Sequence, residues 1–176
     1  QDTKLDTLQS KWAQTICQSS DSLLVVLNDA LDFARLESGK LRLESIAMDP
    51  QEQVHSALRI VDNLIVRAQL KVECKIGAMP ERVRGDPTRI RQILLNLLSN
   101  AIKFTESGGI VVEAHYVDGE LTVAVSDTGL GIPSDRLEYL FDAFVQADRS
   151  TTRRFGGVGL GLAISKNLAE TMGGSL

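Results

Sequence analysis

Amide and cationic side chains recur along one face of the segment RIRQILLNLLSNAIKF, residues 89–104. Asn96, Asn100 and Lys103 are four and three residues apart, so on a helix their side chains lie above one another. Amide oxygens are neutral ligands that a hard cation such as Mg²⁺ accepts, and a lysine ammonium can reach a phosphate as a point charge. This face suits a metal–phosphate group, but taken alone it favours an ordinary solvated surface, because polar helix faces are commonplace.

A carboxylate beside two glycines offers a second kind of chemistry. Asp127 ends a valine-rich segment and precedes Gly129 and Gly131. Its carboxylate can accept a hydrogen bond from the exocyclic amine of adenine, while the glycines permit close approach of the backbone. The alternative interpretation is an Asx turn that ends a strand and continues into ordinary loop glycines.

A glycine-rich segment, FGGVGLGL at residues 155–162, leads into a helical pattern. Exposed amides at the beginning of a helix favour phosphate, although a lone glycine-rich loop is weak evidence. The segment does not match the GxxxxGK[ST] phosphate loop, because no Lys-Ser or Lys-Thr pair follows Gly161.

Apolar spacing predicts the elements that must position these residues. Steps of three and four predict helices in residues 5–39, 51–69, 87–104 and 159–172, with a shorter helix in 135–144. Asp86 followed by Pro87 predicts an N-cap, and Gly39 a helix end. The polar residues Ser19–Ser22 leave open whether the first helix is continuous.

Alternation of apolar and polar residues predicts strands in residues 41–46, 70–76, 110–117 and 120–126, the last two joined by a turn at Asp118 and Gly119. Pro80 and Gly85 indicate a loop. The polar, basic segment 145–158 is expected to be a mobile loop.

Composition limits the class of protein. The chain has 176 residues, 43% hydrophobic and 24% charged, and its net charge of -4 argues against nucleic-acid binding. No apolar run is long enough to span a bilayer, and no signal peptide is evident. Cys17 and Cys74 show neither disulfide nor zinc spacing. We therefore expect a soluble cytoplasmic protein whose segment here contacts neither nucleic acid nor membrane.

Taken in order, four segments resemble the N, G1, F and G2 boxes of sensor histidine kinases of two-component signalling: NLLSNAIKF, DTGLGIP, LFDAF and GGVGLGLAI. DFARLESGKLRLE also resembles the end of the second dimerisation helix and its linker in hybrid kinases. The resemblance covers about residues 23–176, whereas 1–22 matches only in helical character.

The resemblance implies a Bergerat ATP-binding fold of the GHKL superfamily. This is an α/β two-layer sandwich, a mixed sheet with three helices, preceded by a long dimerisation helix. Residues 1–40 would be the second helix of the dimerisation and histidine-phosphotransfer region. Residues 41–176 would be the ATP-binding catalytic domain, expected to lack its last strand or strands.

The resemblance also implies roles for individual residues. Asn96 and Asn100 would hold Mg²⁺ against the triphosphate, Lys103 would contact phosphate, and Asp127 would bind the adenine amine. The other implied ATP-binding residues are Phe104 near the ribose or adenine; Gly129 and Gly131 beside Asp127; Phe141 and Phe144 bracing an ATP lid at 145–155; Arg153 and Arg154 in that lid; and Gly157, Gly159, Leu160 and Gly161 at the phosphates. Arg153 and Arg154 suit a solvated basic loop equally well.

The chain departs from the family pattern in two ways. Val158 stands where the family commonly has Thr or Ser, which removes one hydroxyl contact to phosphate. The phosphoacceptor histidine box is absent: the only histidines are His55 and His115, both expected to be structural or surface residues. We therefore assign no catalytic residue, and expect the chain to be incomplete for autophosphorylation.

The resemblance implies transfer of the γ-phosphoryl group of ATP to a histidine outside this chain, for relay to a response regulator aspartate. The implied partners are a second copy, through the dimerisation helices, and a receiver domain; the chain could be the cytoplasmic part of a membrane-bound sensor. A hydrolytic ATPase of the same superfamily is disfavoured, since those enzymes place Glu at the position of Asn96 and an amide is a poor general base. A degenerate ATP-binding or partner-binding scaffold remains an alternative.

Overall fold

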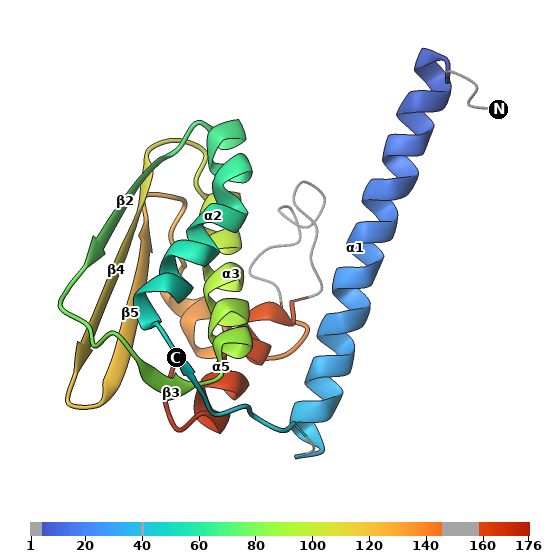
Figure 1. The fold of residues 1–176 in the computed structure, drawn as a ribbon. Helices are drawn as coiled ribbons and strands as arrows, with labels where there is room; N and C mark the ends of the chain where they lie inside the picture. The colour runs from blue at the N-terminus through green and yellow to red at the C-terminus, as the bar shows by residue number, and fades with distance from the viewer. Residues whose placement is uncertain (1–4, 40, 146–158) are drawn as a thin grey trace. The chain divides into compact units, whose positions relative to one another are not determined.

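The chain divides into two compact units, Gln1–Leu41 and Arg42–Leu176. The structure, a computed structural model, describes residues 5–39, 41–145 and 159–176. In the first unit the described residues form one helix, α1 (Thr7–Glu37), and the second unit contains the strands and the other helices (Figure 1). Within the described ranges, no helix has both the length and the apolar character needed to cross a membrane.

Helix α1 is continuous over 31 residues and passes through the polar segment 19–22. A capping box begins it: Asp6 Oδ1 accepts the Gln9 N–H at 2.8 Å, and Gln9 Oε1 accepts the Asp6 N–H at 3.0 Å. Its last residue is Glu37 and its C-cap is Ser38. Gly39 follows with φ +63°, just beyond the cap. Large apolar side chains repeat along α1 and are exposed: Leu8, Trp12, Ile16, Leu23, Leu27 and Leu31.

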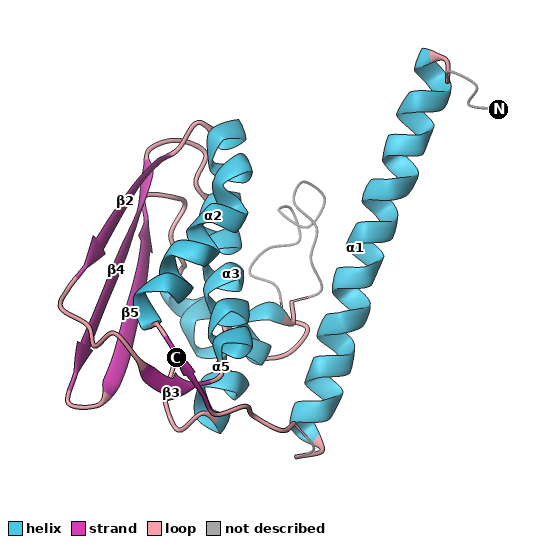
Figure 2. Cartoon of the chain, viewed as in Figure 1, coloured by secondary structure: helices cyan, strands magenta, loops and turns pink. Residues whose placement is uncertain are grey.

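The second unit contains a mixed three-stranded sheet in the order β2-β4-β5 (Figure 2). Strand β2 (Lys71–Ile76) runs parallel to β4 (Gly109–Val117), and β4 runs antiparallel to β5 (Glu120–Asp127). The β4–β5 turn places Asp118 at φ +53° and Gly119 at φ +91°, as a tight hairpin requires. The predicted hairpin is confirmed.

Three helices cover one face of this sheet: α2 (Pro50–Ala68), α3 (Pro87–Phe104) and α5 (Gly161–Thr171) (Figure 1). The core between the layers combines apolar side chains of α2, α3, β4 and the residue before β2: Val54, Ala57, Val61, Ile65, Leu70, Leu94, Leu98, Ala101, Ile110, Val112 and Ala114. Helix α5 buries Leu160, Ala163, Ile164, Leu168 and Ala169. The mixed α/β architecture agrees with the predicted two-layer sandwich, and α3 packs against both other helices.

Three local predictions were wrong. The strand expected at residues 41–46 is displaced, because β1 (Ile46–Met48) pairs antiparallel with β3 (Val83–Gly85), and β3 lies in the segment predicted to be a loop. Glu44, which lies in the expected strand, donates its N–H to the side chain of Asp86, at Oδ2 and 3.0 Å, and not to a neighbouring strand. The helix expected at 135–144 is a shorter 3₁₀ helix, η1 (Ser134–Tyr139). The predicted loop 145–158 lies outside the described residues except for Val145.

Asp86 is buried and is the N-cap of α3, as predicted. Its Oδ1 accepts the N–H groups of Thr88 and Arg89 at 3.1 and 3.0 Å, in addition to the Glu44 bond at Oδ2. Asp86→Ala would leave all three donors without this partner, so we expect it to lower the free energy of unfolding by about 2–3 kcal/mol in urea denaturation.

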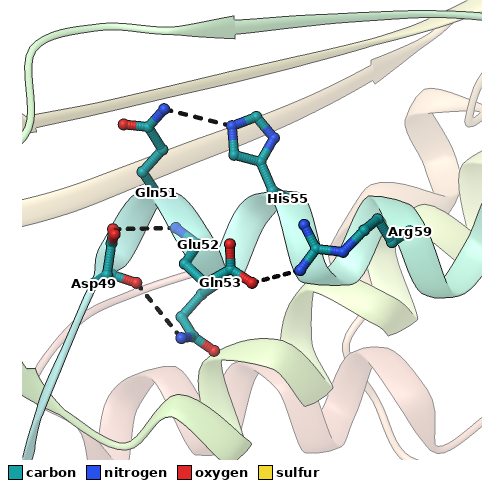
Figure 3. Close-up of polar contacts among 6 residues, drawn as sticks. All are labelled: Asp49, Gln51, Glu52, Gln53, His55 and Arg59. Carbon is teal, nitrogen blue, oxygen red and sulfur yellow. Dashed lines mark hydrogen bonds and ion pairs between the residues drawn. The ribbon is translucent and has the colours of Figure 1, made fainter.

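The matched control is Asp49→Ala at the beginning of α2 (Figure 3). Asp49 is exposed, and among the residues that the structure describes its side chain accepts the Glu52 N–H alone, at 3.1 Å. We expect this variant to lose about 1 kcal/mol. Equal losses in the two variants would contradict a structural role for the bond between Asp86 and Glu44.

Candidate functional site

Asn96 lies where α3 meets the beginning of α5. Its Nδ2 donates a hydrogen bond of 2.8 Å to Ser165 Oγ of α5. A Cβ added to Gly161 would lie 3.0 Å from Asn96 Cγ and closer still to Oδ1, so the amide oxygen faces the first residue of α5. Two residues that the sequence proposed separately, Asn96 and Gly161, are therefore neighbours.

The same face of α3 continues towards its end. Asn100 is half-buried one turn beyond Asn96, and Lys103 is half-buried in the last turn. The Lys103 Nζ lies 4.8 Å from the centroid of the Phe104 ring, a cation–π distance. Burial lowers the pKa of the Lys103 ammonium below its usual value. A bound anion beside this ammonium would offset the loss of solvation.

Asp127 ends β5 on the helix-covered face of the sheet. It pairs in register with the buried Ile110, and paired residues share a face. One carboxylate oxygen, Oδ1, accepts the Gly129 N–H at 2.8 Å. The Asx turn that the sequence left as an alternative is thus present. A carboxylate has further acceptor positions, so the turn and a ligand contact are compatible.

The loop after Asp127 is held against the end of α3 and the beginning of β4. The Leu130 N–H donates to Phe104 O at 3.2 Å, and a Cβ on Gly129 would lie 2.9 Å from the carbonyl carbon of Phe104. Thr128 Oγ1 accepts the Gly109 N–H at 3.0 Å. This loop brings Phe104, Asp127 and Gly129 together, and Gly131 follows in the same loop with φ +68°.

The segment after η1 returns to the beginning of α5. The Phe144 N–H donates to Gly159 O at 3.1 Å, and Phe144 has φ +65°, which is rare for an aromatic residue. The Lys166 Nζ lies 5.4 Å from the centroid of the Phe141 ring. Leu160 is buried directly before Gly161. Of the other predicted residues, Arg153, Arg154 and Gly157 lie outside the described residues.

Ser165 belongs to this cluster and was missed by the sequence reasoning. It is buried on the same face of α5 as Ile164, Leu168 and Ala169. A hydroxyl on an otherwise apolar face was the available signal, because buried polar groups need partners. The partner itself, Asn96, is 69 residues away along the chain.

The residues of α3 fit a metal ion that arrives with a phosphate ligand. No group of three or more His, Cys, Asp or Glu side chains gathers among the residues that the structure describes, so they build no carboxylate-rich cation site. Mg²⁺ commonly keeps waters and substrate phosphates and takes few protein ligands. The amide oxygens of Asn96 and Asn100, with a lysine nearby, match that sparse donor set.

Both histidines lie on the second unit and not on α1. His55 is on α2, where its Nε2 is 3.4 Å from Gln51 Nε2 (Figure 3). His115 is exposed on β4. These positions agree with surface or structural roles.

Known proteins with similar sequences identify the family to which these residues belong. Residues 85–176 match the family described as histidine kinase-, DNA gyrase B-, and HSP90-like ATPases. The chain is 42% identical over 182 residues to the sensor protein GacS of Pseudomonas syringae pv. syringae, covering 100% of this chain and 20% of GacS. It is 41% identical over 180 residues to the signal transduction histidine-protein kinase BarA of Escherichia coli, covering 99% of this chain and 20% of BarA.

A solved structure has the same fold along nearly the whole chain. The crystal structure of full-length ShkA in complex with AMPPNP has a TM-score of 0.83 and 34% sequence identity, covering 98% of this chain and 36% of that one. The chain spans about a fifth of the length of the curated relatives that it matches.

Proposed function

The chain belongs to the family of histidine kinase-, DNA gyrase B- and HSP90-like ATPases, and on this premise we propose that residues 41–176 bind ATP with Mg²⁺ and transfer its γ-phosphoryl group to a histidine outside this chain. One observation carries the proposal. Helix α3 places the Asn96 amide against the beginning of α5, while its end holds the loop of Asp127. The two ends of a nucleotide thus have candidate partners along one helix.

In the proposed site, each group has a distinct task. The Asp127 carboxylate accepts a hydrogen bond from the adenine amine, with Gly129 allowing the loop to lie against Phe104. Asn96 and Asn100 hold Mg²⁺, and Lys103 contacts phosphate. When bound, the metal neutralises charge on the phosphates. Phe141, Phe144, Gly131, Gly159, Leu160 and Gly161 would line the site, together with Arg153, Arg154 and Gly157, which lie outside the described residues.

The protein contributes mainly position and charge in such a transfer. A nitrogen of the acceptor histidine forms the new bond to phosphorus as the bond to the leaving ADP oxygen breaks. We propose that α1 pairs with a second copy through its exposed apolar residues, Leu8, Trp12, Ile16, Leu23, Leu27 and Leu31. The relay to a response regulator aspartate is part of the same proposal and follows from the resemblance to sensor histidine kinases of two-component signalling.

The test is a calorimetric titration of the chain with AMPPNP and Mg²⁺, beside Asp127→Asn. The amide presents one acceptor oxygen and no charge, so we expect about 10-fold to 100-fold weaker binding. The control is Asp62→Asn on the exposed side of α2, which changes the same charge and should leave binding unchanged. Equal affinity of parent and Asp127→Asn would remove Asp127 from the adenine site.

A second candidate function is a scaffold that binds ATP or a partner without transfer. Val158, in place of a hydroxyl residue, favours it. Adding a separate histidine-bearing dimerisation helix pair with Mg²⁺ and ATP decides between the two. Labelling of that histidine supports the kinase, and good ATP binding without labelling supports the scaffold.

A further inference from the structure

Ser165 is a buried hydroxyl to which the proposed chemistry gives no task. It is only 2% exposed and lies on α5 one turn after Gly161. Its neighbours on this face, Ile164, Leu168 and Ala169, are all apolar and buried. Burying a hydroxyl in apolar surroundings costs free energy unless the hydroxyl is hydrogen-bonded. We therefore ask which group is the hydrogen-bond partner of Ser165.

The partner is the side chain of Asn96, whose Nδ2 donates to Ser165 Oγ at 2.8 Å. Ser165 Oγ is therefore the acceptor in this bond. An acceptor selects the nitrogen end of the amide. The other end, Oδ1, then faces Gly161 at the beginning of α5.

We propose that Ser165 is a positioning residue that sets the amide of Asn96, with its nitrogen at Ser165 and its oxygen at Gly161, the beginning of α5, where the metal and phosphates would bind. The inference rests on the proposed function, because it assigns Ser165 a task only if Asn96 is a metal ligand. Partners that orient a metal ligand commonly contribute about 10-fold to 100-fold in metal affinity. Ser165 touches neither nucleotide nor metal in this proposal and acts only through Asn96.

The test compares Ser165→Thr with Ser165→Val in the full chain. Threonine and valine have nearly the same shape, so both place an extra methyl group in the core while only threonine keeps a hydroxyl. AMPPNP is titrated with Mg²⁺ and again with EDTA. We expect Ser165→Val to lose about 10-fold in affinity with Mg²⁺ and nothing with EDTA, and Ser165→Thr to retain most of the Mg²⁺ response.

A second readout needs neither nucleotide nor metal. The Asn96 side-chain amide signals in a ¹⁵N NMR spectrum, identified by their loss in Asn96→Ala, should exchange slowly with water in the parent and in Ser165→Thr. They should exchange fast in Ser165→Val. Thr171→Val is the control, since the Thr171 hydroxyl on the same helix donates to Asn167 O at 2.6 Å and not to Asn96.

The outcomes separate the two proposals. If the parent shows no Mg²⁺-dependent binding of AMPPNP, the proposed function fails, and slow exchange of the Asn96 amide would still support the bond to Ser165. If the parent responds to Mg²⁺ and Ser165→Val responds equally, the positioning role is overturned. Should Ser165→Val unfold, Ser165→Ala replaces it without added volume.

A double variant tests whether Ser165 acts through Asn96. In an Asn96→Ala background, removing the Ser165 hydroxyl should change the Mg²⁺ response no further; a further loss would overturn the inference.

Discussion

Gly129→Ala is expected to detach the loop of residues 127–131 from α3 and to abolish measurable nucleotide binding. The added Cβ would lie 2.9 Å from the Phe104 carbonyl carbon, closer still to its oxygen, and 2.8 Å from Asp127 Oδ1. Two of these atoms are backbone, so no side-chain rotation relieves the clash. Moving the loop breaks the hydrogen bonds from Leu130 N–H to Phe104 O and from Gly129 N–H to Asp127.

We expect Gly129→Ala to lower the free energy of unfolding by about 3–5 kcal/mol, because of the overpacking and the two lost hydrogen bonds. Urea denaturation measures the stability, and titration with AMPPNP measures the binding. The control is Gly119→Ala in the hairpin turn, where a Cβ has no neighbour within 4 Å but φ is +91°. Only backbone strain of about 1 kcal/mol is expected there, with binding retained. If both variants lost equal stability, the close approach at Gly129 would have no consequence.

Local signals in the sequence were sufficient to predict the long helices and the long hairpin. Asp86 and Pro87 locate the beginning of α3 because a cap acts on the next three residues, and the structure shows those bonds. The β4–β5 hairpin was predictable for the same reason, since Asp118 and Gly119 can adopt positive φ. The polar residues 19–22 left the first helix undecided, because serine suits both a cap and an exposed helical position.

Contacts distant in sequence escaped prediction. Strands β1 and β3 have three residues each, too few for an alternating pattern, and each exists because the other pairs with it. Ser165 was missed because one hydroxyl does not disturb the apolar period of α5. Asp127 was the opposite case: the sequence named two alternatives, an adenine contact and an Asx turn, and the turn is present without excluding the contact.

Gly161→Ala is expected to separate metal binding from stability. Here the three atoms nearest to the added Cβ all belong to the side-chain amide of Asn96, with Cγ at 3.0 Å and Oδ1 closer. The Asn96 side chain can rotate away, so we expect the fold to be kept. The free energy of unfolding should fall by about 1–2 kcal/mol, because one buried hydrogen bond is lost while alanine, which favours helix more than glycine does, recovers part of that loss. The rotation would remove Oδ1 from the beginning of α5. We expect the affinity for AMPPNP with Mg²⁺ to fall about 100-fold, and the affinity in EDTA to change little.

The Asn96→Ala background is the decisive control for this variant. Without the Asn96 side chain the Cβ at residue 161 has no amide to displace, so Gly161→Ala should not weaken the Mg²⁺ response further. It should instead add about 0.5–1 kcal/mol of stability, as alanine does over glycine in a helix. Such non-additivity marks two residues that act as one unit. Additive losses of Mg²⁺-dependent binding would mean that Gly161 contributes independently of Asn96, through its own backbone amide at the beginning of α5.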